Sequence, residues 1–287
     1  MTDASPARDL PTSPTPSGWP DDALRLGPPA PGADGRAPLL LITGGSRGIG
    51  AATARLAAAA GWQVALTYAS DAAAAASVVD ALHQRGRRAR AWPLDVADEA
   101  QVVAVFAEVD AWALAEGLAL RGFVNNAGVV DQARRCDEMS GERLRRMVGI
   151  NLLGAMYAAR EAVRRLSTRH GGAGGAIVNV SSVAARLGAS GQYADYAATK
   201  AALDTYTLGL AREVADEGVR VNAIRPGIID TAIHASGGQP DRAQRLASQI
   251  PMQRAGTAEE VAQTIVWLLS PQSSYTTGSI VEVTGGR

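Results

Sequence analysis

Residues 39–50 constrain the fold of this chain more than any other stretch, because they join a short apolar run to three closely spaced glycines. The apolar residues 39–42 are typical of a buried strand, and Gly44, Gly48 and Gly50 follow before an alanine-rich helical stretch. Glycine suits a turn that needs a positive φ, or a backbone that must lie directly against a ligand. A strand that enters a helix through such a turn presents unpaired N–H groups and the positive end of the helix dipole, which favour a bound phosphate. Glycine triplets also occur in ordinary turns, but their place between strand and helix favours a site for a nucleotide pyrophosphate.

The rest of the chain alternates short apolar runs with longer helical stretches. Strands are predicted at 39–42, 64–68, 89–94, 120–125, 176–180, 219–224 and 279–283, and helices at 72–84, 98–116, 142–166, 193–217 and 257–269, besides a first helix that ends near residue 60. The strand ends repeatedly meet Gly, Asn, Asp or Ser, as in a parallel sheet whose carboxyl ends carry the site. Because parallel crossovers are right-handed, helices should cover both faces of the sheet. We therefore expect an α/β fold, a single doubly wound Rossmann-type domain over residues 38–287.

Residues 1–37 differ in composition from the rest of the chain. Nine of its 14 prolines lie between residues 6 and 38, among Ser, Thr, Gly and Asp and few apolar residues. Such a segment buries too little surface to offset the entropy cost of ordering it. It lacks the apolar centre of a secretory signal, and its aspartates argue against a transit peptide. We expect residues 1–37 to be a disordered Pro-rich extension.

The charge balance and the residue counts exclude several classes of partner. The chain has 28 basic and 28 acidic side chains, so neither nucleic acid nor an anionic membrane surface is expected as a partner. No stretch is apolar for long enough to span a bilayer. Cys136 is the single cysteine, so no intrachain disulfide can form, and a cytoplasmic location is expected. His83, His170 and His234 lie far apart without metal-ligand spacing, so we expect surface or loop positions for them and no metal site.

A tyrosine and a lysine four residues apart, Tyr196 and Lys200, are the first candidates for chemistry. Residues i and i+4 share one face of a helix, so the phenol and the ammonium can reach one cleft. A phenol has a reference pKa of about 10. A nearby lysine charge favours the phenolate, which would make Tyr196 a proton donor and acceptor near neutral pH. Alone, this spacing is a common coincidence, and two surface residues would be the better interpretation.

Three further features fall where an α/β sheet would bring them near that pair. Ser181 and Ser182 end the predicted fifth strand, where a hydroxyl could bind a substrate oxygen or simply end the strand. Asn151 interrupts a helical stretch, and because asparagine is a poor interior helix residue, it faces solvent or has a special task. Residues 125–128, Asn-Asn-Ala-Gly, follow the central strand as a switch-point loop or a plain turn.

Taken in order, these features resemble the classical short-chain dehydrogenase/reductase family, close to its sugar dehydrogenases and 3-oxoacyl-carrier-protein reductases. The resemblance spans about residues 38–286. It rests on Thr43, Gly44, Gly48, Gly50, Asp95, Val96, residues 125–128, Asn151, Ser182, Tyr196, Lys200, Pro226, Gly227 and Thr231. It implies a seven-stranded parallel sheet and a nicotinamide cofactor.

The resemblance also implies roles for single residues. Tyr196 transfers the proton, and Lys200 lowers its pKa and holds the cofactor ribose. Ser182 orients the substrate carbonyl, and Asn151 holds a water that links Lys200 to solvent. The implied cofactor-binding set is Gly44, Ser46, Arg47, Gly48, Ile49, Gly50, Asp95, Val96, Asn126, Tyr196, Lys200, Ile229 and Thr231. Ser182 precedes Tyr196 by 14 residues, about one more than in many relatives, so Ser181 remains an alternative, and the extra residue is expected within residues 187–191.

The predicted second strand bears on the choice between NADP and NAD. Dinucleotide folds that select NAD usually carry an acid at the end of this strand, which binds the adenosine ribose hydroxyls. Here Tyr68 stands in that place, and Asp71 should already lie at the start of the next helix. Arg47 could meet a 2′-phosphate as a cation and Ser70 as a hydrogen-bond donor, although Arg47 could also pack over the adenine of either cofactor. We therefore expect NADP rather than NAD.

The expected function is that of an NADP(H)-dependent oxidoreductase, transferring a hydride between the nicotinamide and a small-molecule alcohol/carbonyl substrate. The alternative is a non-catalytic dinucleotide-binding regulator or scaffold, and the complete catalytic set favours the enzyme. Residues 233–252 combine glycines with apolar side chains, which predicts a closing flap over the substrate or an ordinary surface helix. In this family two long helices pack against symmetry mates, so a homodimer or homotetramer is expected. The alanines available for that contact are Ala158, Ala159, Ala162, Ala197, Ala198, Ala201 and Ala202.

Overall fold

The computed structural model of the chain describes residue 28, residue 31 and residues 34–287. The predicted disordered extension over residues 1–37 therefore lies largely outside the described residues. Its last residue, Ala37, belongs to the first strand, where it pairs with Leu118.

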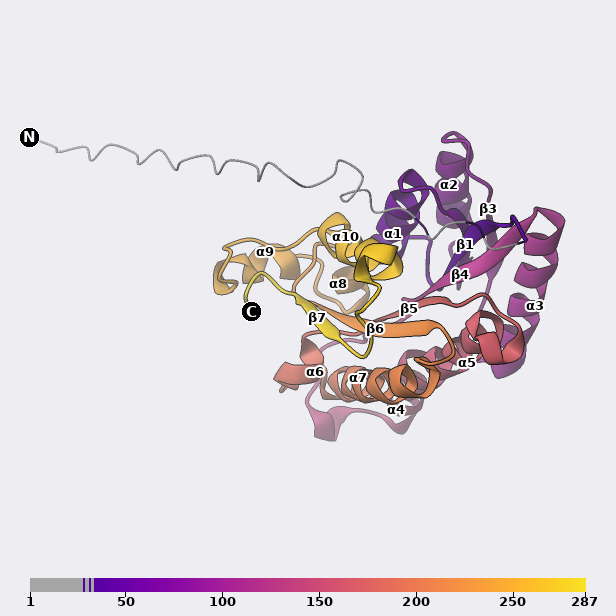
Figure 1. Cartoon of the computed structure of the whole chain (residues 1–287). Coiled ribbons are helices and arrows are strands. Elements are labelled where there is room, and N and C mark those ends of the chain that lie inside the picture. The colour runs from indigo at the N-terminus through magenta and orange to yellow at the C-terminus, as the bar shows by residue number, and fades with distance from the viewer. Residues whose placement is uncertain (1–27, 29–30, 32–33) are drawn as a thin grey trace, which may run out of the picture.

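Within the described residues, seven parallel strands form one sheet in the order β3-β2-β1-β4-β5-β6-β7 (Figure 1). The strands are β1 (Ala37–Ile42), β2 (Gln63–Tyr68), β3 (Ala89–Pro93), β4 (Leu118–Asn125), β5 (Gly175–Val180), β6 (Val219–Pro226) and β7 (Ile280–Val283). The direction of winding reverses between β1 and β4, where a doubly wound sheet opens a crevice at its carboxyl ends. The predicted Rossmann-type sheet is confirmed.

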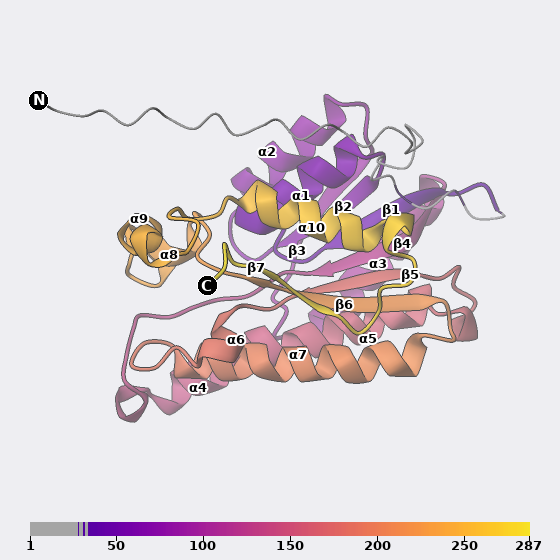
Figure 2. The same cartoon turned by 60° about the vertical axis from the view of Figure 1, so that its left-hand side comes forward.

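Helices cover both faces of this sheet (Figure 2). On one face lie α1 (Gly48–Ala59), α2 (Ala72–His83) and α10 (Ala258–Leu269). On the other lie α3 (Glu99–Ala115), α4 (Gly141–Val148), α5 (Ala155–Leu166) and α7 (Ala194–Val214). Shorter helices are α6 (Ala184–Leu187), α8 (Ile233–Ser236) and α9 (Arg242–Leu246), with 3₁₀ turns at Cys136–Glu138, Thr168–His170, Ala247–Gln249 and Pro271–Ser273.

Strand β1 shows how the core divides between the two faces. Leu40 and Ile42 pack into the apolar cluster under α1, α2 and α10, whereas Leu39 and Leu41 pack into the cluster under α3, α5 and α7. All four side chains are fully buried. Complete burial of one such side chain contributes about 1.5–3 kcal/mol, so this short run anchors both layers. The alternation explains why a continuous apolar run, and not an alternating one, marks a central parallel strand.

The prediction of one continuous helix over residues 142–166 is wrong. A π-helical segment at Gly149–Gly154 separates α4 from α5. Asn151 lies in this segment and is fully buried, so it does not face solvent. Its Oδ1 accepts from the Val129 amide and its Nδ2 donates to the Val129 carbonyl, both at 2.8 Å. Short π segments within helices frequently occur at functional sites, which fits an asparagine turned inward.

The alanines of α5 do not form an outer surface. Ala158, Ala159 and Ala162 are fully buried in the core of the same subunit, where their small size lets α5 approach the sheet closely. The use of these three residues as an oligomer contact is therefore wrong, and Ala197 on α7 is buried as well. The remaining α7 alanines, Ala198, Ala201 and Ala202, are exposed or half-buried. Assembly into a dimer or tetramer stays a prediction.

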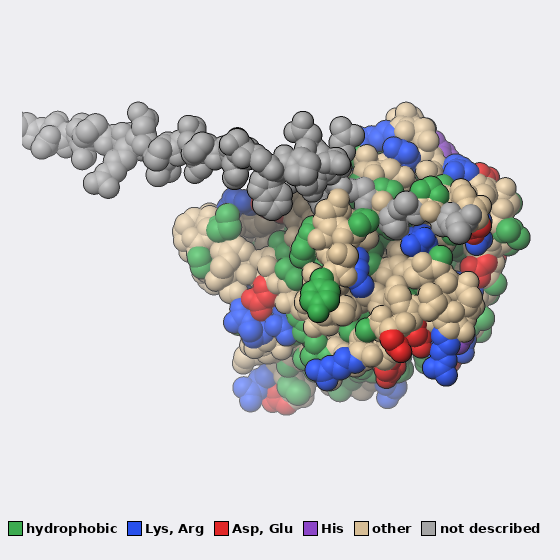
Figure 3. Space-filling view, viewed as in Figure 1, with side chains coloured by type: hydrophobic (Ala, Val, Ile, Leu, Met, Phe, Trp, Pro, Cys, Tyr) green, Lys and Arg blue, Asp and Glu red, His purple; other side chains and the backbone are tan. Residues whose placement is uncertain are grey.

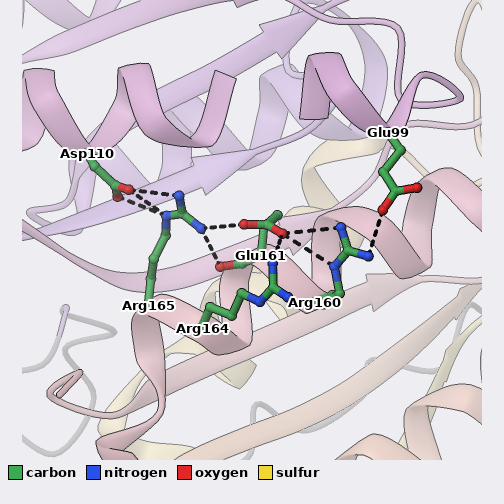
Figure 4. Close-up of polar contacts among 6 residues, drawn as sticks. All are labelled: Glu99, Asp110, Arg160, Glu161, Arg164 and Arg165. Carbon is green, nitrogen blue, oxygen red and sulfur yellow. Dashed lines mark hydrogen bonds and ion pairs between the residues drawn. The ribbon is translucent and has the colours of Figure 1, made fainter. Parts of the chain in front are cut away.

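Helix α5 is tied to α3 by a charged network around Glu161, shown in Figure 4. Glu161 is buried, and its carboxylate accepts from Arg164 at 2.7 Å and from Arg165 at 2.9 Å. Arg165 also pairs with Asp110 of α3. Burial works to raise the pKa of Glu161, but the surrounding arginines outweigh it, and the pKa is lowered. The network fixes the helix that continues directly from the π segment.

The outer surface carries no large area of one charge on the face seen in Figure 3, where blue and red side chains are interspersed. None of the helices in the described part of the chain has the length and apolar character needed to cross a membrane.

Candidate active site

A cavity of about 960 Å³ runs along the carboxyl ends of the strands. Its wall holds nearly all the predicted site residues: Gly44, Ser46, Arg47, Gly48, Ile49, Asp95, Val96, Asn126, Ser182, Tyr196, Lys200, Ile229 and Thr231. Gly50 and Asn151 are not part of the wall and lie behind it. The fold thus gathers residues that are separated by up to 187 positions in the chain.

The glycine turn after β1 has the backbone that the sequence predicts. Gly44 and Gly48 have φ of +64° and +53°, a region that favours glycine. At Gly50 a Cβ would overlap the Gly44 carbonyl oxygen and lie 2.6 Å from Asn126 Nδ2, so this glycine permits close packing. Asn126 Nδ2 donates to the carbonyls of Thr43 and Gly44, at 3.0 and 2.9 Å, and so holds the turn.

The start of α1 fits a phosphate group. Arg47 is its N-cap residue and makes no side-chain capping bond, and the first turn contains no acidic residue. No local carboxylate or hydroxyl therefore satisfies the first backbone N–H groups of the helix. These N–H groups form the positive end of the helix dipole. The exposed side chain of Arg47 adds a cation at the cavity wall.

The far end of the cavity is bordered by the ends of β2 and β3. Tyr68 ends β2, and Asp71 caps α2, its Oδ1 accepting from the Ala74 amide at 2.9 Å. Asp71 thus lies at the start of α2, as the sequence predicts. After β3, Asp95 Oδ1 accepts from the Ala97 amide at 3.0 Å, which shapes the loop beside the cavity.

Tyr196 and Lys200 lie on one face of α7, with Lys200 Nζ 5.7 Å from the centre of the Tyr196 ring. Lys200 is buried, and its Nζ donates to the Val180 carbonyl at 2.8 Å. Burial lowers the pKa of Lys200 to about 8, although the charge of Asp204 opposes this. Burial also raises the pKa of Tyr196, while a hydrogen bond with Ser182 opposes the rise. The pKa of Tyr196 thus lies above its usual value in this structure, and a lowering of that pKa by Lys200 stays a prediction.

The two neighbouring serines have different surroundings. Ser181 is buried and its Oγ donates to the Lys200 carbonyl at 3.2 Å, which joins β5 to α7. Ser182 lies at the cavity wall and hydrogen-bonds the Tyr196 side chain, and its Oγ also accepts from the Ala184 amide at 3.1 Å. The structure brings Ser182, not Ser181, to the phenol.

Asn151 approaches Lys200 from behind the wall. A Cβ on Gly128 would lie 3.2 Å from Asn151 Oδ1 and 3.5 Å from Lys200 Nζ, so the two side chains meet at this glycine. Both N–H groups of the Asn151 amide have partners, the Val129 carbonyl and Met147 Sδ, and its Oδ1 accepts from the Val129 amide. A water held by Asn151 stays a prediction.

Comparison with known proteins agrees with this geometry. The family described as enoyl-(acyl carrier protein) reductase matches residues 44–287. The uncharacterised oxidoreductase YgfF of Escherichia coli (strain K12) is 50% identical over 249 residues, covering 87% of this chain and 99% of the relative. The chain belongs to the short-chain dehydrogenase/reductase family. As a member of that family it is an oxidoreductase.

Two further matches extend the comparison. The cis-4-hydroxycyclohexanecarboxylate dehydrogenase of Sinomonas cyclohexanicum is 38% identical over 248 residues, covering 86% of this chain and 94% of the relative. A short-chain dehydrogenase of Burkholderia cenocepacia J2315, solved in complex with NADP, superposes with a TM-score of 0.79 at 32% identity and covers 91% of this chain and 98% of that one. Both matches cover at least 86% of this chain.

In this short-chain dehydrogenase/reductase, residues 233–252 form α8, α9 and the turns around them (Figure 1). Several residues of this segment line the cavity. Gln239 Nε2 donates to the Tyr193 hydroxyl at 2.6 Å, and Arg242 Nη1 donates to Gln192 Oε1 at 2.8 Å. These bonds join the segment to the chain just before Tyr196. Its helices are too short for a periodic pattern, so the sequence did not predict their bounds.

His234 is a cavity residue that the sequence misses, since a lone histidine in a loop offers no partner spacing. It lines the cavity from α8, and its Nε2 lies 2.8 Å from the Ile229 carbonyl. Burial lowers its pKa. Arg242 and Arg287 also line the cavity and were not predicted to. Among the described residues, no cluster of His, Cys, Asp and Glu side chains is arranged to hold a metal ion.

Proposed function

We propose that this chain is an NADP(H)-dependent oxidoreductase that interconverts an alcohol and a carbonyl compound. The observation that carries the proposal is the contact between Ser182 and Tyr196 at the cavity wall, with the buried ammonium of Lys200 beneath the phenol. A hydroxyl, a phenol and a cation in one wall suit an oxygen that gains or loses a proton as its carbon changes oxidation state.

The bound nicotinamide supplies the hydride for reduction or accepts it in oxidation. Ser182 donates a hydrogen bond to the substrate oxygen and fixes its orientation. Tyr196 then gives its phenolic proton to that oxygen in reduction, and takes a proton from it in oxidation. Because burial raises the pKa of Tyr196, the phenol keeps its proton near neutral pH and is ready to act as the acid. Lys200, with a pKa of about 8, is mostly cationic at pH 7 and stabilises the phenolate that the transfer leaves.

The residues that would hold the cofactor follow the cavity from end to end. The turn at Gly44–Gly50 and the α1 amides suit the phosphates, and Asp95 and Val96 suit the adenine. Asn126 and Lys200 suit the ribose, with Ile229 and Thr231 at the nicotinamide. The choice of NADP over NAD rests on Tyr68, which ends β2 where an acid would repel a 2′-phosphate, and on the exposed Arg47. A relative solved with NADP supports the same choice.

The relatives' names support alcohol/carbonyl chemistry, since one is named for a hydroxylated cyclohexanecarboxylate. The alternative of a non-catalytic dinucleotide-binding scaffold is not favoured, because binding without turnover does not require Ser182, Tyr196 and Lys200 together in the cavity wall. The exposed single cysteine, Cys136, is consistent with a reducing compartment, and we propose a cytoplasmic homodimer or homotetramer.

The test follows nicotinamide absorbance with a panel of aldehydes, ketones and sugars, comparing the wild type with Tyr196→Phe. Loss of general acid–base catalysis should reduce the rate about 10²- to 10⁴-fold. Cofactor affinity, measured by fluorescence titration, should change little. Wild-type rates in the variant would refute the role of Tyr196, and cofactor binding without any turnover by the wild type would favour the scaffold.

A further inference from the structure

Two arginines, Arg242 and Arg287, line the cavity near α9. Arg242 is the first residue of α9, and Arg287 follows β7 at the C-terminal end, which Figures 1 and 2 both place beside α8 and α9. Neither guanidinium has a carboxylate within 4.0 Å among the residues that the structure describes. They lie close enough that the charge of Arg287 contributes to lowering the pKa of Arg242, after the larger effect of burial.

Arg242 contacts only neutral partners among the described residues. Its Nη1 donates to Gln192 Oε1 at 2.8 Å and to Gln239 Oε1 at 3.1 Å. Its guanidinium carbon lies 5.2 Å from the centre of the Tyr193 ring. These contacts orient the side chain without neutralising it, because an arginine stays protonated in proteins.

Arg287 has a buried N–H group that lacks a partner. Its Nη1 is buried and makes no hydrogen bond to any residue that the structure describes. An unsatisfied buried donor is costly, and more so on a charged group. The backbone of Arg287 is held in place, because Arg186 Nη2 donates to its carbonyl at 2.8 Å. The residue is therefore held at the cavity wall with one N–H group of its guanidinium unpaired among the described residues.

The other charged groups of the cavity wall have partners or lie elsewhere. Arg146 pairs with Asp131 at 2.9 Å. Asp71 and Asp95 border the end formed by β2 and β3, where each accepts from a backbone amide. Next to α9, Asp241 pairs with Arg245 at 3.8 Å, and Asp230 accepts from Gln244. Among the described side chains of the wall, Arg242 and Arg287 are thus left without an ion-pair partner.

We propose that the substrate is an anionic carbonyl compound or alcohol, whose carboxylate or phosphate binds between Arg242 and Arg287. This inference rests on the proposed function. Arginine presents a planar fork of N–H groups that matches either anion in a bidentate contact. Arg242 packs over Tyr193, three residues before Tyr196, so the anion site lies about one helical turn along α7 from the proton donor. A compound that spans this distance places its anion on the arginines and its carbonyl on Tyr196.

A different role for Arg242 is to latch α9 onto Gln192 through its hydrogen bonds. A latch would affect all substrates alike, whereas an anion site affects only charged ones. Two matched pairs of probes separate these roles: 4-oxopentanoate with its methyl ester, and dihydroxyacetone phosphate with dihydroxyacetone. With NADPH and the full chain, we expect the anion of at least one pair to have a kcat/KM roughly tenfold or more above that of its neutral partner. Only the anion can form charged hydrogen bonds with the arginines, and such bonds contribute enough free energy for this ratio.

Variants then assign the preference to the two residues. Arg242→Gln and Arg287→Gln should each lower kcat/KM for the preferred anion by roughly tenfold, mainly through KM, and change the neutral partner less than about twofold. Arg212→Gln is the matched control, because Arg212 is exposed on α7 and is not part of the cavity wall. Equal losses for anion and neutral partner would identify a latch and overturn the inference.

Calorimetry with the NADPH-saturated enzyme gives a second readout that does not depend on turnover. Binding of 4-oxopentanoate or dihydroxyacetone phosphate that weakens in Arg287→Gln supports the anion site, and absence of binding by both overturns it. Reduction of the neutral probes as fast as the anions would overturn only this inference, and the proposed function would stand. Absence of any turnover on the panel above would instead count against the proposed function.

Discussion

Asp204 lies one helical turn beyond Lys200 on α7, and both side chains are buried. Burial lowers the pKa of Lys200 to about 8, and the Asp204 carboxylate opposes that shift. Asp204 Oδ2 accepts from Arg225 Nε at 2.9 Å, while Oδ1 has no hydrogen-bond partner within the described part of the chain. The carboxylate thus keeps the lysine more basic than burial alone would allow.

Asp204→Asn should lower the pKa of Lys200 below about 8, because the amide lacks the charge that favours the ammonium. The ammonium is present below this pKa and is lost as the pH rises through it. The alkaline limb of the pH–rate profile for carbonyl reduction should therefore move to lower pH. Glu282→Gln is the control, since Glu282 Oε1 is another partner of Arg225, at 3.2 Å, and should leave the limb in place. An unmoved limb in Asp204→Asn would contradict the prediction.

Arg143 and Asp195 form a buried ion pair that joins α4 to the start of α7, directly before Tyr196. Arg143 Nε and Nη2 lie 2.7 and 3.1 Å from the two carboxylate oxygens. Arg143→Met would leave Asp195 buried and unpaired, which typically costs about 3–5 kcal/mol in the free energy of unfolding. Urea denaturation measures this.

An exposed pair serves as the comparison for that measurement. Arg135 Nε and Asp137 Oδ1 lie at a similar distance, 2.8 Å, but both side chains are exposed. Arg135→Met should therefore cost less than about 1 kcal/mol. Similar losses at both sites would mean that burial of the first pair has no energetic consequence.

Cofactor choice should depend on Arg47 and Tyr68, which border the same end of the cavity. Arg47→Ala should weaken NADP(H) more than NAD(H), by roughly tenfold or more, if the guanidinium binds the 2′-phosphate with charged hydrogen bonds. Tyr68→Asp should shift preference further towards NAD(H), because the carboxylate repels that phosphate. Steady-state kinetics with both cofactors measures the ratio. Equal efficiency of the wild type with both would contradict the assignment.

Gly50→Ala should disrupt the glycine turn, because the added Cβ overlaps the Gly44 carbonyl and crowds Asn126. If the turn binds the cofactor phosphates as proposed, cofactor binding should weaken by roughly tenfold or more in fluorescence titration. Gly209→Ala on α7 is the matched control. A Cβ there meets no atom within 4 Å, so helix propensity should stabilise the protein by about 0.5–1 kcal/mol. Intact cofactor binding by Gly50→Ala would show that the turn can relax.

Features that depend on neighbouring residues could be predicted from the sequence. The alternation of apolar runs with helical stretches gives the sheet, because each strand is a local run such as Leu39–Ile42 and each crossover has one hand. The i,i+4 spacing of Tyr196 and Lys200 likewise gives a shared helix face. The phosphate turn follows from glycines whose positive φ no other residue adopts as readily.

Features that depend on distant contacts could not be predicted in this way. Ser181 and Ser182 are equivalent in sequence, and only the packing of β5 against α7 turns one towards the Lys200 carbonyl and the other towards Tyr196. Burial raises the pKa of Tyr196, and burial is a property of the whole fold that the spacing of Tyr196 and Lys200 does not reveal. Arg242 and Arg287 meet at the cavity from segments with no periodic pattern, so no local signal joins them.

The π segment at Gly149–Gly154 has a consequence for how this chain tolerates changes in length. A π turn closes on the residue five positions away instead of four, so the segment holds one residue more than a continuous α-helix would. Each residue of an α-helix turns the next by about 100°, so deleting one residue here would restore regular hydrogen bonding and swing Asn151 away from Val129. The deletion would also leave α4 and α5 out of phase with the partners that hold them, Asp195 for α4 and α3 for α5. The shortened helix would thus have more regular hydrogen bonds, but its side chains would no longer face their partners. The π segment therefore sets the rotation of α4 relative to α5 about the helix axis.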